Sequence, residues 1–86
     1  MAVQSEEMQD ALEILEDLKD DNTIPKNVRS AIERVITSLN DEKSDMSIRI
    51  DRAMQELDEI SSDINLQPYS RSQLWHITSV LEKFQT

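Results

Sequence analysis

The sequence predicts an all-α protein, a four-helix bundle made of two repeated helical hairpins. Residues 15–39 match residues 57–81 at a constant offset and without a gap, for example Leu15 with Leu57, and helical repeats show such long periods. Apolar residues also recur at intervals of three and four along four segments, as they do on the buried face of a helix. Finally, the 86 residues include two prolines and no glycine, which disfavours the hairpin turns of sheet proteins.

The repeat indicates one domain, residues 1–86, that contains a hairpin at residues 5–40 and another at residues 44–84. Two copies are fewer than the roughly three that an open solenoid needs to bury its faces. We therefore expect the hairpins to close on each other as a bundle. The alternative is an open, HEAT-like pair of hairpins.

The first hairpin has recognisable helix ends. Ser5 is expected as the N-cap of its first helix. Pro25 is expected at the first position of the next helix, where a missing N–H costs nothing. Asn40 is expected to end that helix in a left-handed conformation, in place of glycine. The apolar stripes of the two helices are Met8, Ala11, Leu12, Ile14, Leu15 and Leu18, and then Val28, Ala31, Ile32, Val35, Ile36 and Leu39.

The second hairpin repeats this design with small changes. Ser44 or Asp45 is expected to cap its first helix, and Pro68 stands in its turn. Trp75 lies one position off the apolar stripe of the last helix, so we expect it to be partly exposed. The two stripes are Met46, Ile50, Ala53, Leu57 and Ile60, with Met54 beside them, and then Leu74, Ile77, Thr78, Leu81 and Phe84.

Acidic side chains dominate the composition. The chain has 18 Asp and Glu against 9 Lys and Arg, a net charge of -9. This charge repels nucleic-acid phosphates and anionic membranes, so we expect neither as a partner. The surplus is interpreted first as an aid to solubility, and otherwise as a surface for a basic protein partner.

No residue pattern predicts catalysis, a cofactor or a metal ion. Cysteine and glycine are absent, which excludes thiolate ligands, thiol nucleophiles and glycine-rich phosphate loops. His76 is the only histidine, and no acid stands at the Glu-x-x-His spacing of di-metal bundles. An enzyme or ligand carrier that uses His76 is the alternative. The sequence shows neither a signal-peptide pattern nor a membrane-spanning run. We expect a cytoplasmic location, with which the absence of cysteine is compatible.

A repeated pair of charges marks the two predicted turns. Asp21 precedes Arg29 by eight residues, and Asp63 precedes Arg71 by eight. An aspartate at a helix end can accept hydrogen bonds from turn N–H groups while the guanidinium reaches its carboxylate. We expect these four side chains to staple their loops. The alternative is an anion site at the two arginines.

The aromatic residues gather near the end of the chain. Tyr69, Trp75 and Phe84 are the only three, and interface hot spots favour Trp and Tyr. We expect partner binding, if present, to use Tyr69, Trp75 and His76. The alternative is that the aromatic rings thicken an otherwise aliphatic core.

Two stretches carry a resemblance to a known family. They are Ile24-Pro25-x-Asn27-Val28-Arg29 and the segment from Asp63-x-Asn65 through Arg71 to Trp75. Over nearly its whole length the chain resembles a small archaeal family of unknown function, family 0147 of the UPF series. The resemblance implies an all-helical four-helix bundle from an archaeal cytoplasm and supplies no activity, substrate or site. The Asp-to-Arg pattern is also similar to the loops of HEAT repeats.

These observations favour a non-enzymatic protein-interaction domain with a basic protein partner. The alternative function is that of a structural homo-oligomer that acts alone and whose interface uses the region around Trp75.

Overall fold

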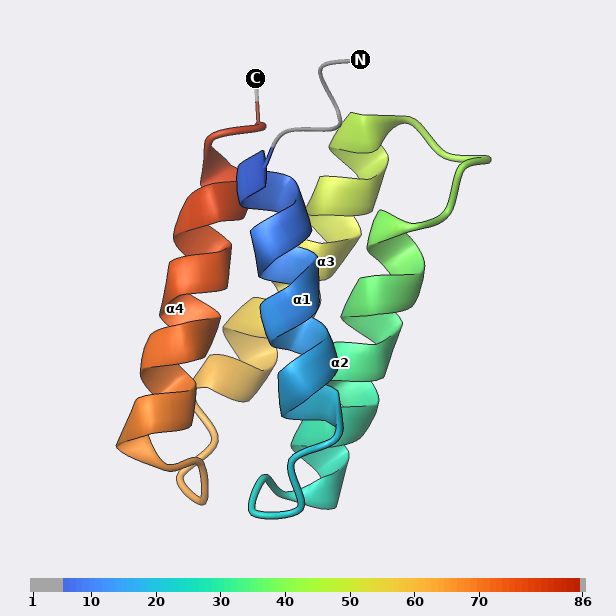
Figure 1. The fold of residues 1–86 in the computed structure, drawn as a ribbon. Helices are drawn as coiled ribbons and strands as arrows, with labels where there is room; N and C mark the ends of the chain where they lie inside the picture. Colours follow the sequence, from blue (N-terminus) through green and yellow to red (C-terminus); the bar gives the residue numbers. More distant parts are fainter. Residues whose placement is uncertain (1–5, 86) are drawn as a thin grey trace.

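The computed structural model describes residues 6–85, which form a closed bundle of four α-helices (Figure 1). Successive helices run antiparallel, and the last helix packs against the first as well as against the third. The predicted four-helix bundle is therefore confirmed, and the open pair of hairpins is not formed. Ser5, the expected first N-cap, lies outside the described residues. The helices are α1 (Glu6–Lys19), α2 (Lys26–Leu39), α3 (Met46–Ser61) and α4 (Pro68–Glu82).

The core is aliphatic and continuous through the bundle. Each helix buries the centre of its predicted stripe, and burying one Leu or Ile contributes about 1.5–3 kcal/mol. Thr78 and Phe84 are only half-buried, whereas Val80 and Ser70, which the stripe of α4 omitted, are buried. Val80 and Ser70 extend the buried face of α4 beyond the predicted stripe, and α4 packs against both α1 and α3. The largest fully buried hydrophobic side chains are Leu15, Val28, Ile32, Val35, Ile50, Leu57, Leu74, Ile77 and Leu81.

Three loops of equal length connect the helices. Residues 20–25, 40–45 and 62–67 are six residues each. The first and third loops lie together at one end of the bundle and the second lies at the other end (Figure 1). Ile24 and Leu66 in the first and third loops are buried, so these loops close the core at their end.

Two predicted helix ends are wrong in detail. Pro25 is the N-cap of α2 rather than its first helical residue, because its ψ of 145° is extended. Asn40 has a φ of -95°, and no described residue has a positive φ. Its N–H donates to the Ile36 carbonyl, and the N–H of Asp41 donates to the Ser38 carbonyl, so α2 ends without the left-handed turn. Asp45 is the N-cap of α3, although its side chain makes no capping bond.

Candidate functional site

The same aspartate contact recurs in all three loops. In each loop the carboxylate of the second residue accepts a hydrogen bond from the backbone N–H two positions later, which forms an Asx-turn. This contact fixes the first bend after each helix. The three N···O distances are 2.9 Å from Thr23 to Asp21, 3.1 Å from Lys43 to Asp41, and 2.8 Å from Asn65 to Asp63.

Hydrogen bonds to the charged form lower the pKa values of these aspartates below their ordinary range. In every case the nearby arginine contributes less than the hydrogen bonds do. The carboxylates are therefore held mainly by their own turns. The main causes of the lowered pKa values are the Thr23 hydroxyl for Asp21, the Lys43 backbone N–H for Asp41, and the Asn27 side-chain amide for Asp63.

The arginines bind backbone carbonyls, and this differs from the expected contact with the aspartate carboxylates. Arg71 makes three of these bonds. Its Nε donates to the Ser61 carbonyl at 3.1 Å. Its Nη2 donates to the carbonyls of Asp63 at 2.9 Å and Leu66 at 3.4 Å. By comparison, Arg29 makes one such bond, from Nε to the Ile24 carbonyl at 3.1 Å. Whether Asp21, Arg29, Asp63 and Arg71 stabilise their loops stays a prediction.

Sequence reasoning missed a third copy of this loop between α2 and α3. Arg49 follows Asp41 by eight residues, and its Nε donates to the Ser44 carbonyl at 2.9 Å. Its Nη1 reaches the Leu39 carbonyl at 3.3 Å. The spacing of eight residues between the aspartate and the arginine could have revealed this copy. The loop is harder to recognise in the sequence because Ser44 occupies the position where the other two loops carry a buried apolar residue.

The arginine contacts explain how these helices end without glycine. The last carbonyls of a helix lack partners within it, and glycine in the left-handed conformation commonly supplies them. Here the Arg49 guanidinium donates to the carbonyl of the last residue of α2, and the Arg71 guanidinium donates to the carbonyl of the last residue of α3. Each cation also lies at the negative end of a helix dipole. Thus an arginine in the first turn of one helix caps the preceding helix.

A further hydrogen bond joins the first and third loops. The Asn27 amide donates to Asp63 Oδ2 at 3.0 Å, and both residues are on the surface of the bundle end that the two loops close. Since these residues are distant in sequence, the bond links the two hairpins.

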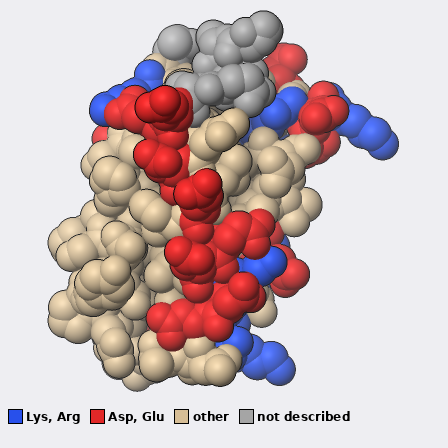
Figure 2. Space-filling model, in the orientation of Figure 1, with Lys and Arg blue, Asp and Glu red and all other residues tan. Residues whose placement is uncertain are grey.

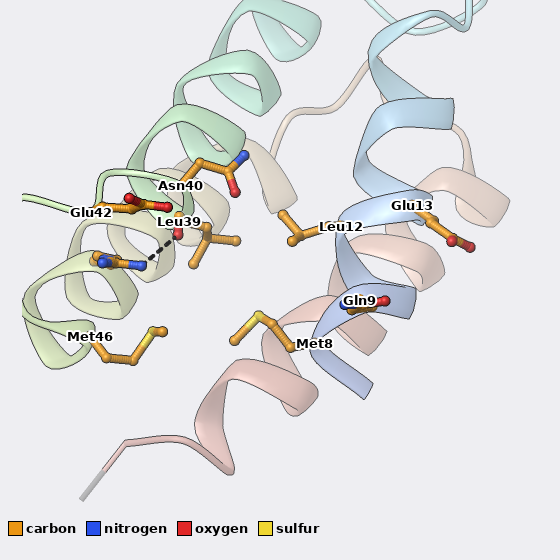
Figure 3. A pocket seen from close by; sticks show the side chains of 9 residues that line it. Met8, Gln9, Leu12, Glu13, Leu39, Asn40, Glu42 and Met46 are labelled. Atoms are coloured by element: carbon orange, nitrogen blue, oxygen red, sulfur yellow. Dashed lines mark hydrogen bonds between the residues drawn. The ribbon is translucent and has the colours of Figure 1, made fainter. Parts of the chain in front are cut away.

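A hollow of about 380 Å³ lies at the opposite end, beside the second loop (Figure 3). Met8 and Leu12 of α1 face Leu39 of α2 and Met46 of α3 across it (Figure 3). The second loop carries half-buried Ser44 where Ile24 and Leu66 plug the other end.

A second hollow, which we call the α3–α4 groove, has a volume of about 370 Å³ and contains the only tryptophan. The Trp75 side chain is 57% exposed, in agreement with its expected place at the flank of the buried face. The hydroxyls of Ser61 and Thr78 donate to carbonyls of their own helices, so they are not free donors toward the groove. The groove is lined by Asp51, Met54, Gln55, Asp58 and Ser61 of α3 and by Trp75, Thr78 and Glu82 of α4.

The other two residues expected at a partner site do not line this groove. Tyr69 is 71% exposed and its hydroxyl accepts a hydrogen bond from Gln73. At roughly 100° per residue, Tyr69 and Trp75 point about 120° apart around α4. His76 is exposed, next to Trp75 in sequence but outside the groove lining. The predicted trio is therefore divided between two flanks of α4.

Charge is distributed unevenly over the surface. Figure 2 shows the Asp and Glu side chains as a stripe along α1, beside a largely uncharged area over α4. Exposed acids of this stripe include Asp10, Glu13 and Asp17. Lys83 Nζ and Glu7 Oε2 form an ion pair at 2.6 Å, which links the end of α4 to the start of α1.

The fold places this protein in the class of compact bundles of four antiparallel helices, and arginines of the following helices cap the ends of α2 and α3. Within residues 6–85 there is neither a group of acids and histidines able to hold a metal ion nor a helix suited to crossing a membrane. A model of the uncharacterised protein family UPF0147 matches residues 1–84, and the chain belongs to this family. The resemblance seen in the sequence is thereby confirmed.

Relatives of the chain occur in several archaea. A UPF0147 protein of Methanothermobacter thermautotrophicus is 37% identical over 73 residues, which cover 85% of this chain and 72% of the relative. A second, TK2131 of Thermococcus kodakarensis, is 35% identical over 80 residues, covering 92% and 96%. These names give a family and no activity.

Solved structures share the fold. A crystal structure of a UPF0147 protein from Thermoplasma acidophilum has a TM-score of 0.91 at 28% identity and covers 99% of this chain and 100% of that one. The unknown-function protein MMP1188 has a TM-score of 0.88 at 31% identity, covering 96% and 94%. The biological function of the family is unknown.

Proposed function

We propose that this protein is a non-enzymatic interaction domain that binds another protein through the α3–α4 groove. The observation that carries the proposal is the exposed indole of Trp75 in a hollow between two helices. Tryptophan is enriched among the residues that dominate binding energy at interfaces. A large exposed aromatic ring in a concave site is therefore a good anchor for a partner.

The surroundings of Trp75 also support binding over catalysis. The groove contains carboxylates, amide and hydroxyl groups but no histidine. Catalytic carboxylates need an environment that drives their pKa values apart, and the groove is open to solvent. An enzyme or ligand carrier that depends on His76 receives no support from the exposed position of that residue. We propose a cytoplasmic location, with which the cysteine-free sequence is compatible.

Affinity capture from native extract tests the proposal with three forms of the protein. Truncating a hot-spot tryptophan costs about 2 kcal/mol or more, which corresponds to a loss of roughly thirtyfold in affinity. We therefore expect one stoichiometric partner with the wild type and little of it with Trp75→Ala. Glu13→Ala, a surface change on α1, should capture the partner normally.

Tyr69→Ala serves as the matched aromatic control, because Tyr69 is exposed on the other flank of α4. The proposal fails if a folded Trp75→Ala protein captures every partner of the wild type. It also fails if no partner is captured and light scattering shows a defined homo-oligomer, since that is the alternative function.

A further inference from the structure

The proposed interaction leaves open what kind of segment enters the α3–α4 groove, and the charges of the molecule address this question. Three carboxylates surround Trp75 in the groove, and no lysine or arginine lines it. In the part of the chain that is described, Asp51, Asp58 and Glu82 take part in no ion pair. Their negative charge is thus available to a partner.

The three acids lie on both sides of the indole. Because α3 and α4 run antiparallel (Figure 1), Asp51 and Glu82 lie toward one end of the groove. Asp58 lies toward the other end. Half-buried Met54 adds apolar surface beside the ring. A segment that spans the groove would therefore contact an apolar centre and negative charge at each end.

A second copy of this chain would have few unpaired basic side chains with which to bind the groove. Within residues 6–85, seven of the nine basic side chains hold an ion pair or a backbone carbonyl, and Lys26 and Lys43 are the exceptions. Two copies that met through this groove would also bring like charges together, which opposes association. A second copy is therefore a poor occupant.

We infer that the occupant is a basic segment of a different protein, with an arginine whose guanidinium stacks on the Trp75 indole. Guanidinium groups favour aromatic faces and bind carboxylates through two parallel hydrogen bonds. The groove supplies both features, an exposed indole and unpaired carboxylates on either side. This inference rests on the proposed function and specifies the chemistry of its partner.

Labelled hexaarginine serves as the probe, with binding followed by fluorescence anisotropy. The groove variant carries Asp51→Asn, Asp58→Asn and Glu82→Gln. The matched control carries Asp10→Asn, Glu13→Gln and Asp17→Asn on α1, so the two proteins have equal net charge. We expect the groove variant to lose about tenfold in affinity and the control to lose less than about threefold, because close carboxylates count more than distant ones.

Two further measurements address the indole. Trp75 is the only tryptophan, so unlabelled hexaarginine should change the intrinsic emission of the wild type and of the α1 control alike. Trp75→Leu keeps an apolar side chain but removes the π-face, and it should weaken binding about threefold or more. Hexalysine should bind less tightly than hexaarginine, and hexaglutamate should not bind.

The inference is overturned if both charge variants lose the same affinity, since net charge alone would then attract the peptide. Equal binding of hexaglutamate, or no binding of hexaarginine, also overturns it. If hexaarginine fails to bind while partner capture still depends on Trp75, the inference fails and the proposed function stands. If capture is indifferent to Trp75, the proposed function itself fails.

Discussion

Replacing Arg71 with alanine tests whether arginine contacts hold the loops of this bundle. Arg71 is half-buried and donates three hydrogen bonds to the carbonyls of Ser61, Asp63 and Leu66. Such a bond contributes about 1 kcal/mol at a partly exposed site, and the longest of the three contributes less. The variant should therefore lose about 2–3 kcal/mol of unfolding free energy.

The arginines of the other two loops allow the loss of stability to be compared with the number of hydrogen bonds removed. Arg49 makes two carbonyl bonds and Arg29 makes one, so alanine variants should lose about 1–2 and about 1 kcal/mol, respectively. Urea unfolding followed by circular dichroism measures these losses. A slope near 1 kcal/mol per molar predicts that Arg71→Ala lowers the midpoint by about 2 M or more.

Two controls separate this effect from a change of net charge. Lys43→Ala removes a positive charge from an exposed loop position whose ammonium group has no described partner, and it should change stability by less than about 0.5 kcal/mol. Arg71→Lys keeps the charge but loses the planar fork, so it should recover only part of the loss. Equal midpoints for the three arginine variants, or a Lys43→Ala loss as large as that of Arg71→Ala, would refute the reasoning.

Two further outcomes are expected. Hydrogen bonds, first from the Asn27 amide and then from the Asn65 N–H, hold the pKa of Asp63 below its ordinary value. The stabilisation they give is present above the pKa of an aspartate in the unfolded chain, about 3.9, and is lost as the pH falls through the lower pKa of the folded state. Urea midpoints between about pH 5 and pH 3 should therefore fall less steeply in Asp63→Asn than in the wild type or in the exposed control Asp58→Asn, and equal slopes would contradict this. Broad hydrolase, phosphatase and transferase screens on metal-supplemented protein should stay at background, and an activity that disappears in His76→Ala would prove the protein to be an enzyme.

The fold could be predicted because its signals are local and repeated. Residues three and four apart lie on one helix face, so the apolar spacing identified all four helices. The width of a buried face is not a local property, however. Val80 is buried although it lies outside the predicted stripe, because the extent of a buried face depends on how the neighbouring helices α1 and α3 pack against α4.

The candidate site could be predicted only in part. The flank position of Trp75 followed from the helix period, but its acidic neighbours on α3 depend on how two helices are rotated against each other. The partners of Arg71 depend on the backbone path of the loop, which turns carbonyl groups toward the guanidinium. The bond between Asn27 and Asp63 requires two loops from different hairpins to meet. Sequence spacing contains none of these quantities.

The closed arrangement of the helices has a consequence for chain connectivity. Glu7 and Lys83 form an ion pair across the junction of α1 and α4, at the end of the bundle that also holds the second loop (Figure 1). Three of the four helix junctions are already bridged by six-residue connectors that share an aspartate turn. A fourth connector of the same pattern would make the backbone circular, and any of the other three could then be cut. We therefore expect the fold to tolerate circular permutation, because each helix would keep the same two neighbours whichever junction is left open.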